Sequence, residues 1–157
     1  MIRPVSIQDN ADLARMIRQV FDEHGAPHAG TVYSDPTTDD LFHTFQVPGA
    51  ALFVYDDGAG HKACCGIYPT PGLAPHHVEL VKFYAPTALR GKGIGALLLN
   101  RCMQEAHAFG YTHMYLECHS VFQAAVQLYT NNGFIRVDHP LGNSGHGGCN
   151  IWMLKSL

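Results

Sequence analysis

The sequence has no surplus of basic residues, no long apolar run and no leader-like N-terminus. Its 157 residues carry 10 Lys and Arg against 13 Asp and Glu, for a formal net charge of −3. Domains that bind nucleic acid usually carry a basic surplus, so nucleic acid is not expected as a partner. No apolar run approaches the ~20 residues of a membrane-spanning helix. We therefore expect a soluble, cytoplasmic protein with no membrane partner.

Cysteine and histidine are present, but without the spacing of disulfide frameworks or metal sites. The five cysteines are odd in number and include no C-x-x-C pair, which argues against disulfides and a zinc knuckle. They are Cys64, Cys65, Cys102, Cys118 and Cys149. Most lie in apolar segments, where a free cysteine usually packs as a small hydrophobic side chain rather than acting as a nucleophile.

The histidines that lie close together do not have ligand spacing such as H-x-x-x-H. Two pairs are adjacent in sequence, His76 with His77 and Cys118 with His119, while His139 and His146 are single loop residues. We therefore expect no metal.

A chain of this length suits one domain, residues 1–157, with a core large enough to be stable alone. Strands are expected at 2–5, 50–55, 62–68, 78–84, 112–118, 134–137 and 149–154. Helices are expected from Ser6 or Asp9 to about Glu23, from Asp35 or Thr37 through Phe45, from Ala96 to near Gly110, and over 122–132. The order β-α-α-β-β-β-α-β-α-β-β implies a mixed sheet with helices on both faces.

The segment Arg90–Gly95 lies between a strand and a helix and has the composition of an anion-binding loop. Its glycines occupy alternate positions, which lets the backbone turn tightly and present N–H groups to a ligand. The following helix adds its free N-terminal N–H groups and the positive end of its dipole, roughly half an elementary charge. Arg90 and Lys92 add full charges. The loop therefore predicts a site for a pyrophosphate.

A dinucleotide-binding loop is the main alternative, because 91–96 also satisfies G-x-G-x-x-A and Glu117 ends the next strand. That fingerprint places its first glycine at the carboxyl end of the strand. Here residues 85–89, including Pro86, intervene, and two cationic side chains lie within the loop. A dinucleotide is therefore disfavoured, and a structural turn without any ligand is the third interpretation.

A second motif follows the glycine loop at about thirty residues. The run 125–134 reads A-x-x-L-Y-x-x-x-G-F, and Arg90–Gly95 reads R-x-x-G-x-G. Together they resemble the GNAT superfamily of N-acetyltransferases, most strongly from Glu79 to Phe134. The resemblance implies the GNAT α/β fold, a central mixed and mostly antiparallel sheet of about seven strands with helices on both faces. It also implies acetyl-coenzyme A as the acyl donor.

The resemblance assigns residues to this donor and to the chemistry on it. Those assigned to binding it are Phe83, Tyr84, Ala85, Arg90, Gly91, Lys92, Gly93, Ile94, Gly95 and Asn131. In the family, a backbone N–H of the bulged strand before the glycine loop stabilises the oxyanion, and a tyrosine at the position of Tyr129 gives a proton to the sulfur. The ordinary pKa is about 10 for a phenol and about 8.5 for a thiol, so proton transfer from Tyr129 to the thiolate is uphill by about 2 kcal/mol. A hydrogen bond from Tyr129 to the thiolate is therefore the alternative. Tyr129 could also simply pack in the core.

Acetyl transfer to an amine also needs a group that takes the amine's proton. Glu79 lies eleven residues before Arg90, where some GNAT enzymes place a glutamate that draws this proton through water. Burial in an apolar strand would raise its pKa toward neutrality. His119 is the second candidate base, solvent is the third, and Glu79 could instead pair with Lys82 or a histidine.

We therefore predict an N-acetyltransferase that moves an acetyl group directly to a primary amine of a small molecule or peptide in a ternary complex. A non-catalytic sensor that binds coenzyme A is the alternative. Asp35, Asp39, Asp40 and Glu23 could make the approach of a cationic amine acidic, and His146 in a glycine-rich loop could reach the acceptor. A homodimer is left open.

Overall fold

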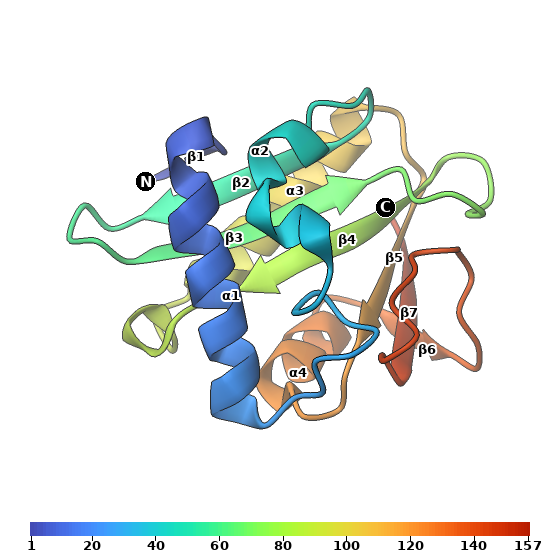
Figure 1. Ribbon diagram of the computed structural model, residues 1–157. Helices are drawn as coiled ribbons and strands as arrows, with labels where there is room; N and C mark the ends of the chain where they lie inside the picture. The colour runs from blue at the N-terminus through green and yellow to red at the C-terminus, as the bar shows by residue number, and fades with distance from the viewer.

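The computed structural model describes residues 1–157 as a single seven-stranded sheet with helices on both faces (Figure 1). The strand order is β1-β2-β3-β4-β5-β7-β6, and only β4 and β5 are parallel. The strands are β1 Ile2–Pro4, β2 Ala51–Asp56, β3 Lys62–Tyr68, β4 His77–Tyr84, β5 His113–Cys118, β6 Ile135–Val137 and β7 Ile151–Ser156. The helices are α1 Asn10–His24, α2 Leu41–Thr44, α3 Ile94–Ala108 and α4 Gln123–Asn131. The predicted fold class and element order are confirmed.

Two apolar clusters cover the two faces of the sheet. In Figure 1, α1 and α2 lie on one face and α3 on the other. The first cluster joins the stripe of α1, including Leu13 and Ile17, to Leu41 and to β2. The second joins α3, through Leu98 and Leu99, to the opposite side of the central strands. None of the helices has the length and apolarity to cross a bilayer.

The second predicted helix is shorter than expected. It consists of a 3-10 turn at Pro36–Asp39 and then α2, with Asp40 between them at φ −139° and ψ 63°. The Asp40 carboxylate accepts a hydrogen bond from the backbone N–H of His43 and so caps the new helix. A local capping residue therefore divides a segment that hydrophobic spacing alone would leave continuous.

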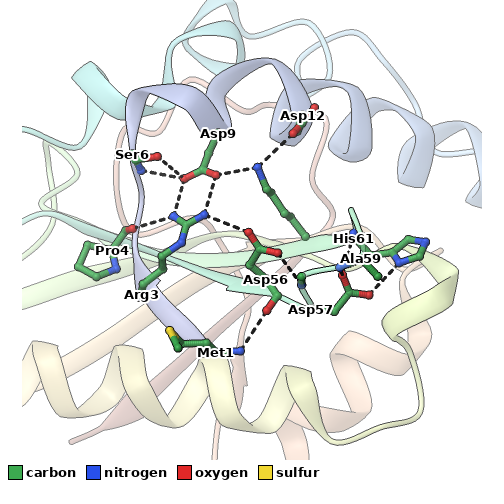
Figure 2. Close-up of polar contacts among 12 residues, drawn as sticks. Met1, Arg3, Pro4, Ser6, Asp9, Asp12, Asp56, Asp57, Ala59 and His61 are labelled. Atoms are coloured by element: carbon green, nitrogen blue, oxygen red, sulfur yellow. Dashed lines mark hydrogen bonds and ion pairs between the residues drawn. The ribbon is translucent and has the colours of Figure 1, made fainter.

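A buried ion network fastens the start of α1 to the first three strands (Figure 2). Asp9 is 1% exposed and accepts hydrogen bonds from Arg3 at 2.7 and 2.9 Å, while Lys62 lies 2.9 Å from its Oδ1. Burial would raise the pKa of Asp9, but the hydrogen bonds from Arg3, Ser6 and Lys62 outweigh it and hold the pKa far below its usual range. The network fixes α1 in place, and the other end of this helix reaches the candidate site.

Two irregularities of β4 shape that site. The β4–β5 ladder stops at the pair Leu80–Leu116 although both strands continue, so they diverge beyond it. On its other edge, β4 shifts register against β3 between Cys64 and Gly66, where Lys82 takes φ +55°. This is a β-bulge, which bends a strand and redirects its side chains.

Candidate active site

A cavity of about 390 Å³ opens where β4 and β5 diverge. The end of α1, the glycine loop, α4 and the segments after β5 enclose it. Most of its lining is apolar, and its acidic, basic and histidine side chains are those of His24, Glu79, Lys82, Arg90, Glu117, His119 and His146. Mostly apolar walls with a few convergent polar groups are typical of a ligand site.

The glycine loop forms one end of this cavity and presents free N–H donors. From Gly91 to Ala96, no backbone N–H donates a hydrogen bond within the chain; the first that does is that of Leu97, to Gly93. Gly91 and Gly93 take φ of +71° and +76°, and a Cβ on either would meet nothing within 4 Å. These glycines are therefore needed for the backbone conformation, which points consecutive donors at open space. Such a run of N–H groups before a helix fits a phosphate.

The two cations of the loop have different surroundings. Arg90 lines the cavity, but its guanidinium donates to Glu23 of α1 at 2.8 Å and to the carbonyl of Ala85 at 2.9 Å. It therefore ties the loop to α1 and to the end of β4. Lys92 is exposed, and it is not among the residues that line the cavity.

The predicted stretch Phe83–Ala85 lines the cavity directly after the bulge. Phe83 also sets the spacing of the glycine loop, because a Cβ on Gly95 would lie 3.0 Å from its ring. Gly95 therefore serves close packing, in contrast to the other loop glycines. The residues of the strand do not reveal the bulge, which only the family resemblance implied.

Tyr129 projects from α4 into the same cavity and is 5% exposed. Its ring packs against Phe83 and Phe134, with centroids 5.6 and 5.8 Å apart. Its hydroxyl has no hydrogen-bond partner in the chain yet is not sealed from the cavity. Burial raises the pKa of Tyr129 well above its usual value, so the hydroxyl stays protonated and can donate a hydrogen bond.

Glu79 lies on β4 and is 3% exposed. Burial raises its pKa from 4.5 to about 7, with the charge of Glu117 adding to the rise, while a hydrogen bond from Thr70 and the charge of Lys82 oppose it. The Thr70 hydroxyl donates to Glu79 Oε1 at 2.7 Å. Glu79 forms no salt bridge with Lys82 or any histidine. A carboxyl group with this pKa can accept a proton near neutral pH.

The other two predicted side chains are placed differently. His119 is half-buried in the wall of the large cavity, and its Nδ1 accepts a hydrogen bond from the N–H of Val121 at 3.2 Å. Asn131 is exposed and absent from the cavity wall, with its Oδ1 bonded to Gln127 at 2.8 Å. The structure thus brings Tyr129, Glu79 and His119 to one cavity and leaves Asn131 outside it.

A second, polar cavity of about 180 Å³ adjoins the first. Glu79, Val81, Lys82 and His146 line both, so the two cavities meet at β4. The loop before β7 closes one side, where His146 Nε2 lies 2.8 Å from Asp35 Oδ2. Burial would raise the pKa of Asp35, but hydrogen bonds from His146 and Thr37 lower it to about 2.

Sequence reasoning missed the placement of Lys82, which is 6% exposed and lines both cavities. The sign in the sequence was that a lysine occurs within the apolar strand 78–84. We considered this lysine only as a partner for Glu79. Neither the bulge nor the lack of such a pairing is visible in the sequence.

Comparisons with known proteins point to one family and fold. The model of the acetyltransferase (GNAT) family matches residues 16–134. A protein of Escherichia coli strain K12, named uncharacterized N-acetyltransferase YjgM, is 35% identical over 158 residues, covering 100% of this chain and 95% of that protein. A GNAT acetyltransferase structure from Staphylococcus aureus Mu50 aligns with a TM-score of 0.85 at 17% identity, covering 99% and 98% of the two chains. A structure from Salmonella typhimurium, described with its cofactor acetyl-CoA, has a TM-score of 0.75 at 20% identity, covering 99% and 92%.

Proposed function

The chain belongs to the acetyltransferase (GNAT) family and is an acyltransferase, and on that premise we propose that it moves an acetyl group from acetyl-coenzyme A to a primary amine of a small molecule or peptide. The transfer is direct and takes place in a ternary complex. Residues 1–157 act as one domain, because elements from α1 to the loop before β7 contribute to the two cavities.

The observation that carries this proposal is the run of free N–H groups from Gly91 to Ala96 at the end of the large cavity. A diphosphate on these donors would leave the arm of the donor to run between the diverging strands. Phe83–Ala85 and Tyr129 line that path. Family members binding acetyl-CoA or CoA support the same donor here.

Acetyl-coenzyme A supplies the acetyl group as a thioester, and the chain supplies the remaining chemistry. Glu79, with its pKa raised to about 7, takes a proton from the acceptor amine at the junction of the two cavities. Backbone N–H groups at the bulge hold the negative charge that develops on the carbonyl oxygen. Tyr129 donates a hydrogen bond to the departing sulfur. Because burial raises the pKa of this tyrosine, hydrogen bonding describes its role better than complete proton transfer.

His119 is the second candidate for the base, but Glu79 is better placed for the role. Glu79 lines both cavities, whereas His119 lines only the large one. We assign the large cavity to the acetyl donor and the polar cavity to the acceptor amine, and call them the donor cavity and the acceptor cavity. A base that serves the acceptor should lie where these two cavities meet.

Ligand-induced stabilisation and an amine screen test this function. Acetyl-coenzyme A should raise the melting temperature more than NADH does, because only the former matches the loop and the apolar arm path. An equal shift, or none, would remove the basis for the donor site. A panel of amines should then give acetylated product. Stabilisation by the donor without any product would indicate a sensor rather than an enzyme.

A further inference from the structure

Lys82 is a buried cation without a partner at the junction of the two cavities. Its side chain is 6% exposed and forms no hydrogen bond and no salt bridge. Because no side-chain nitrogen or oxygen in the chain is both sealed and unpartnered, Lys82 Nζ must retain contact with open cavity space. A buried ammonium without a counter-ion is costly. A lysine at this position therefore calls for an anion that the chain does not supply.

The two nearest carboxylates already have other partners. Asp35 Oδ2 lies 2.8 Å from His146, and its Oδ1 accepts hydrogen bonds from the N–H and hydroxyl of Thr37 at 2.9 and 2.7 Å. Glu79 Oε1 accepts from Thr70. Burial lowers the pKa of Lys82, and the charges of Asp35 and Glu79 oppose this effect, but neither acid is paired with the lysine. A bound anion would likewise favour the charged form. The geometry thus keeps the ammonium available to a ligand.

The backbone holds Lys82 in this position at an energetic cost. Its φ of +55° lies in the left-handed region, which non-glycine residues seldom adopt. Strained residues of this kind cluster at ligand sites and persist only where their surroundings enforce them. Here Cys64 enforces it, donating from its Sγ to the carbonyl of Lys82 at 3.0 Å.

Resting on the proposed function, we propose that Lys82 binds a carboxylate of the acceptor, so that the acceptor is a small amine that also bears a carboxylate, as in an amino acid. The amine would then lie at Glu79, three residues along the same strand. Tyr68 and Asn143 also line the cavity and carry polar groups that can bind the rest of such a molecule. The hydroxyls of Thr44 and Ser144, two further lining residues, already donate to Asp40 and Glu117.

The size and charge of the cavity favour a small monoanion. Its volume of about 180 Å³ lies below the ~300 Å³ at which pockets for drug-sized ligands begin. The cavity holds one lysine beside two acidic residues, so each negative charge of a ligand is repelled by Asp35 and Glu79. A carboxylate brings one such charge and a doubly charged phosphate two, so the carboxylate is favoured.

The test compares amino acids with their carboxamides, which keep the amine but lose the charge, in the wild type and in Lys82→Met. Methionine replaces the lysine chain as far as Cε without the ammonium group and, like lysine, has a Cβ at the strained φ. In the wild type, kcat/KM should favour the carboxylates by about tenfold or more. In Lys82→Met this preference should disappear at every pH. The pH profile on the carboxamides should move to higher pH, because the charge of Lys82 no longer lowers the pKa of Glu79. Lys82→Arg should recover part of the preference.

The outcomes separate this proposal from the proposed function. The role of Lys82 would be refuted if amines were acetylated without any preference for the carboxylate, or if the preference persisted in Lys82→Met. Either result would leave the proposed acetyltransferase activity standing. A preference for amino phosphates would also refute the carboxylate assignment. The pH profile should move in either case, because the charge of Lys82 lowers the pKa of Glu79. Equal losses of activity on carboxylates and carboxamides would therefore be the sign that Lys82 acts only through Glu79.

A binding measurement covers the case in which no amine is turned over. N-acetyl amino acids should stabilise the wild type more than N-acetyl amino acid amides, and Lys82→Met should abolish the difference. Equal stabilisation by the two ligands would refute the proposal even without turnover. Lys82→Met should itself melt no lower than the wild type, because it removes an unpaired buried charge. A large destabilisation would indicate a structural lysine instead.

Discussion

Glu79→Gln tests whether the buried carboxyl group titrates near neutral pH. The amide keeps the shape of the side chain and the oxygen that accepts from Thr70, but it cannot ionise. Both the stability and the activity of the variant should therefore differ from the wild type in a pH-dependent way. The two readouts follow from the same pKa, so agreement between them is a strong test.

The stability effect can be worked out from the shift in pKa. Burial raises the pKa of Glu79 from 4.5 to about 7. Since the folded-state value is the higher one, this group's contribution to stability is complete below pH 4.5 and is lost as the pH rises through about 7. A difference of about 2.5 in pKa corresponds to about 3 kcal/mol. Relative to the wild type, Glu79→Gln should gain about 2–3 kcal/mol in the free energy of unfolding between pH 5 and pH 8.

Urea denaturation of both proteins at several pH values measures this gain. The gap should widen from pH 5 through about pH 7 and level off by about pH 8, because Glu79 is half ionised at its pKa of about 7 and mostly ionised one pH unit above it. Parallel stability curves for the two proteins would show that Glu79 does not titrate there. The desolvation argument would then be wrong.

Activity should change in the opposite direction. In the wild type, kcat/KM should rise with pH and level off near 7, and Glu79→Gln should lose about 10²–10⁴ in rate. The loss should be largest at and below pH 7 and should narrow above it, where water deprotonates more of the amine. A loss that is uniform across the pH range would argue against a base.

Thr70→Val is the matched control, since it leaves the carboxyl group in place. The Thr70 hydroxyl hydrogen-bonds Glu79 and lowers its pKa. Removing this donor should move the pH–rate profile to higher pH while retaining activity on the plateau. A profile that does not move would mean that another group, such as His119, sets the pH dependence.

Three further predictions concern the donor side of the site. Tyr129→Phe should lower kcat about 10- to 100-fold with little change in the Kd of acetyl-coenzyme A, since a hydrogen bond to a charged sulfur is lost; unchanged kcat would assign Tyr129 to packing. Gly93→Ala should weaken the binding of acetyl-coenzyme A about tenfold in calorimetry, because it strains a loop residue at φ +76°. The control Gly110→Ala, at φ +86° after α3, should leave this binding unchanged. Cys64 and Cys65 are both fully buried, so Cys64→Ala and Cys65→Ala should each lower the free energy of unfolding in urea titrations by about 1–2 kcal/mol. Only Cys64→Ala should also lower activity, because Cys64 alone supports the bulge. Equal activities would exclude that support.

Features encoded locally could be predicted from the sequence. Hydrophobic periodicity located the helices, alternating glycines located the anion loop, and an acid within an apolar strand predicted the raised pKa of Glu79. Each of these depends on residues close together in the chain. The fold followed because its element order permits few arrangements.

Features that depend on tertiary packing could not be predicted. The pair of His146 with Asp35 joins residues 111 positions apart. Asn131 was assigned from its place next to a motif, yet it lies two residues from Tyr129, and residues at that spacing point to different sides of a helix. It therefore faces solvent. Arg90 was expected to offer its charge to a ligand, but its pairing with Glu23 requires knowledge of where α1 ends.

The bulge in β4 links the donor and acceptor halves of the site through one stretch of backbone. It turns Lys82 toward the acceptor cavity and begins the stretch Phe83–Ala85 along the donor cavity. On the opposing strand, Gly66 borders the register shift, and it lets β3 lie close to β2, because a Cβ on Gly66 would lie 2.8 Å from the carbonyl oxygen of Ala51. A substitution that flattens the bulge must disturb acceptor choice and donor binding together, whereas Lys82→Met disturbs only the first.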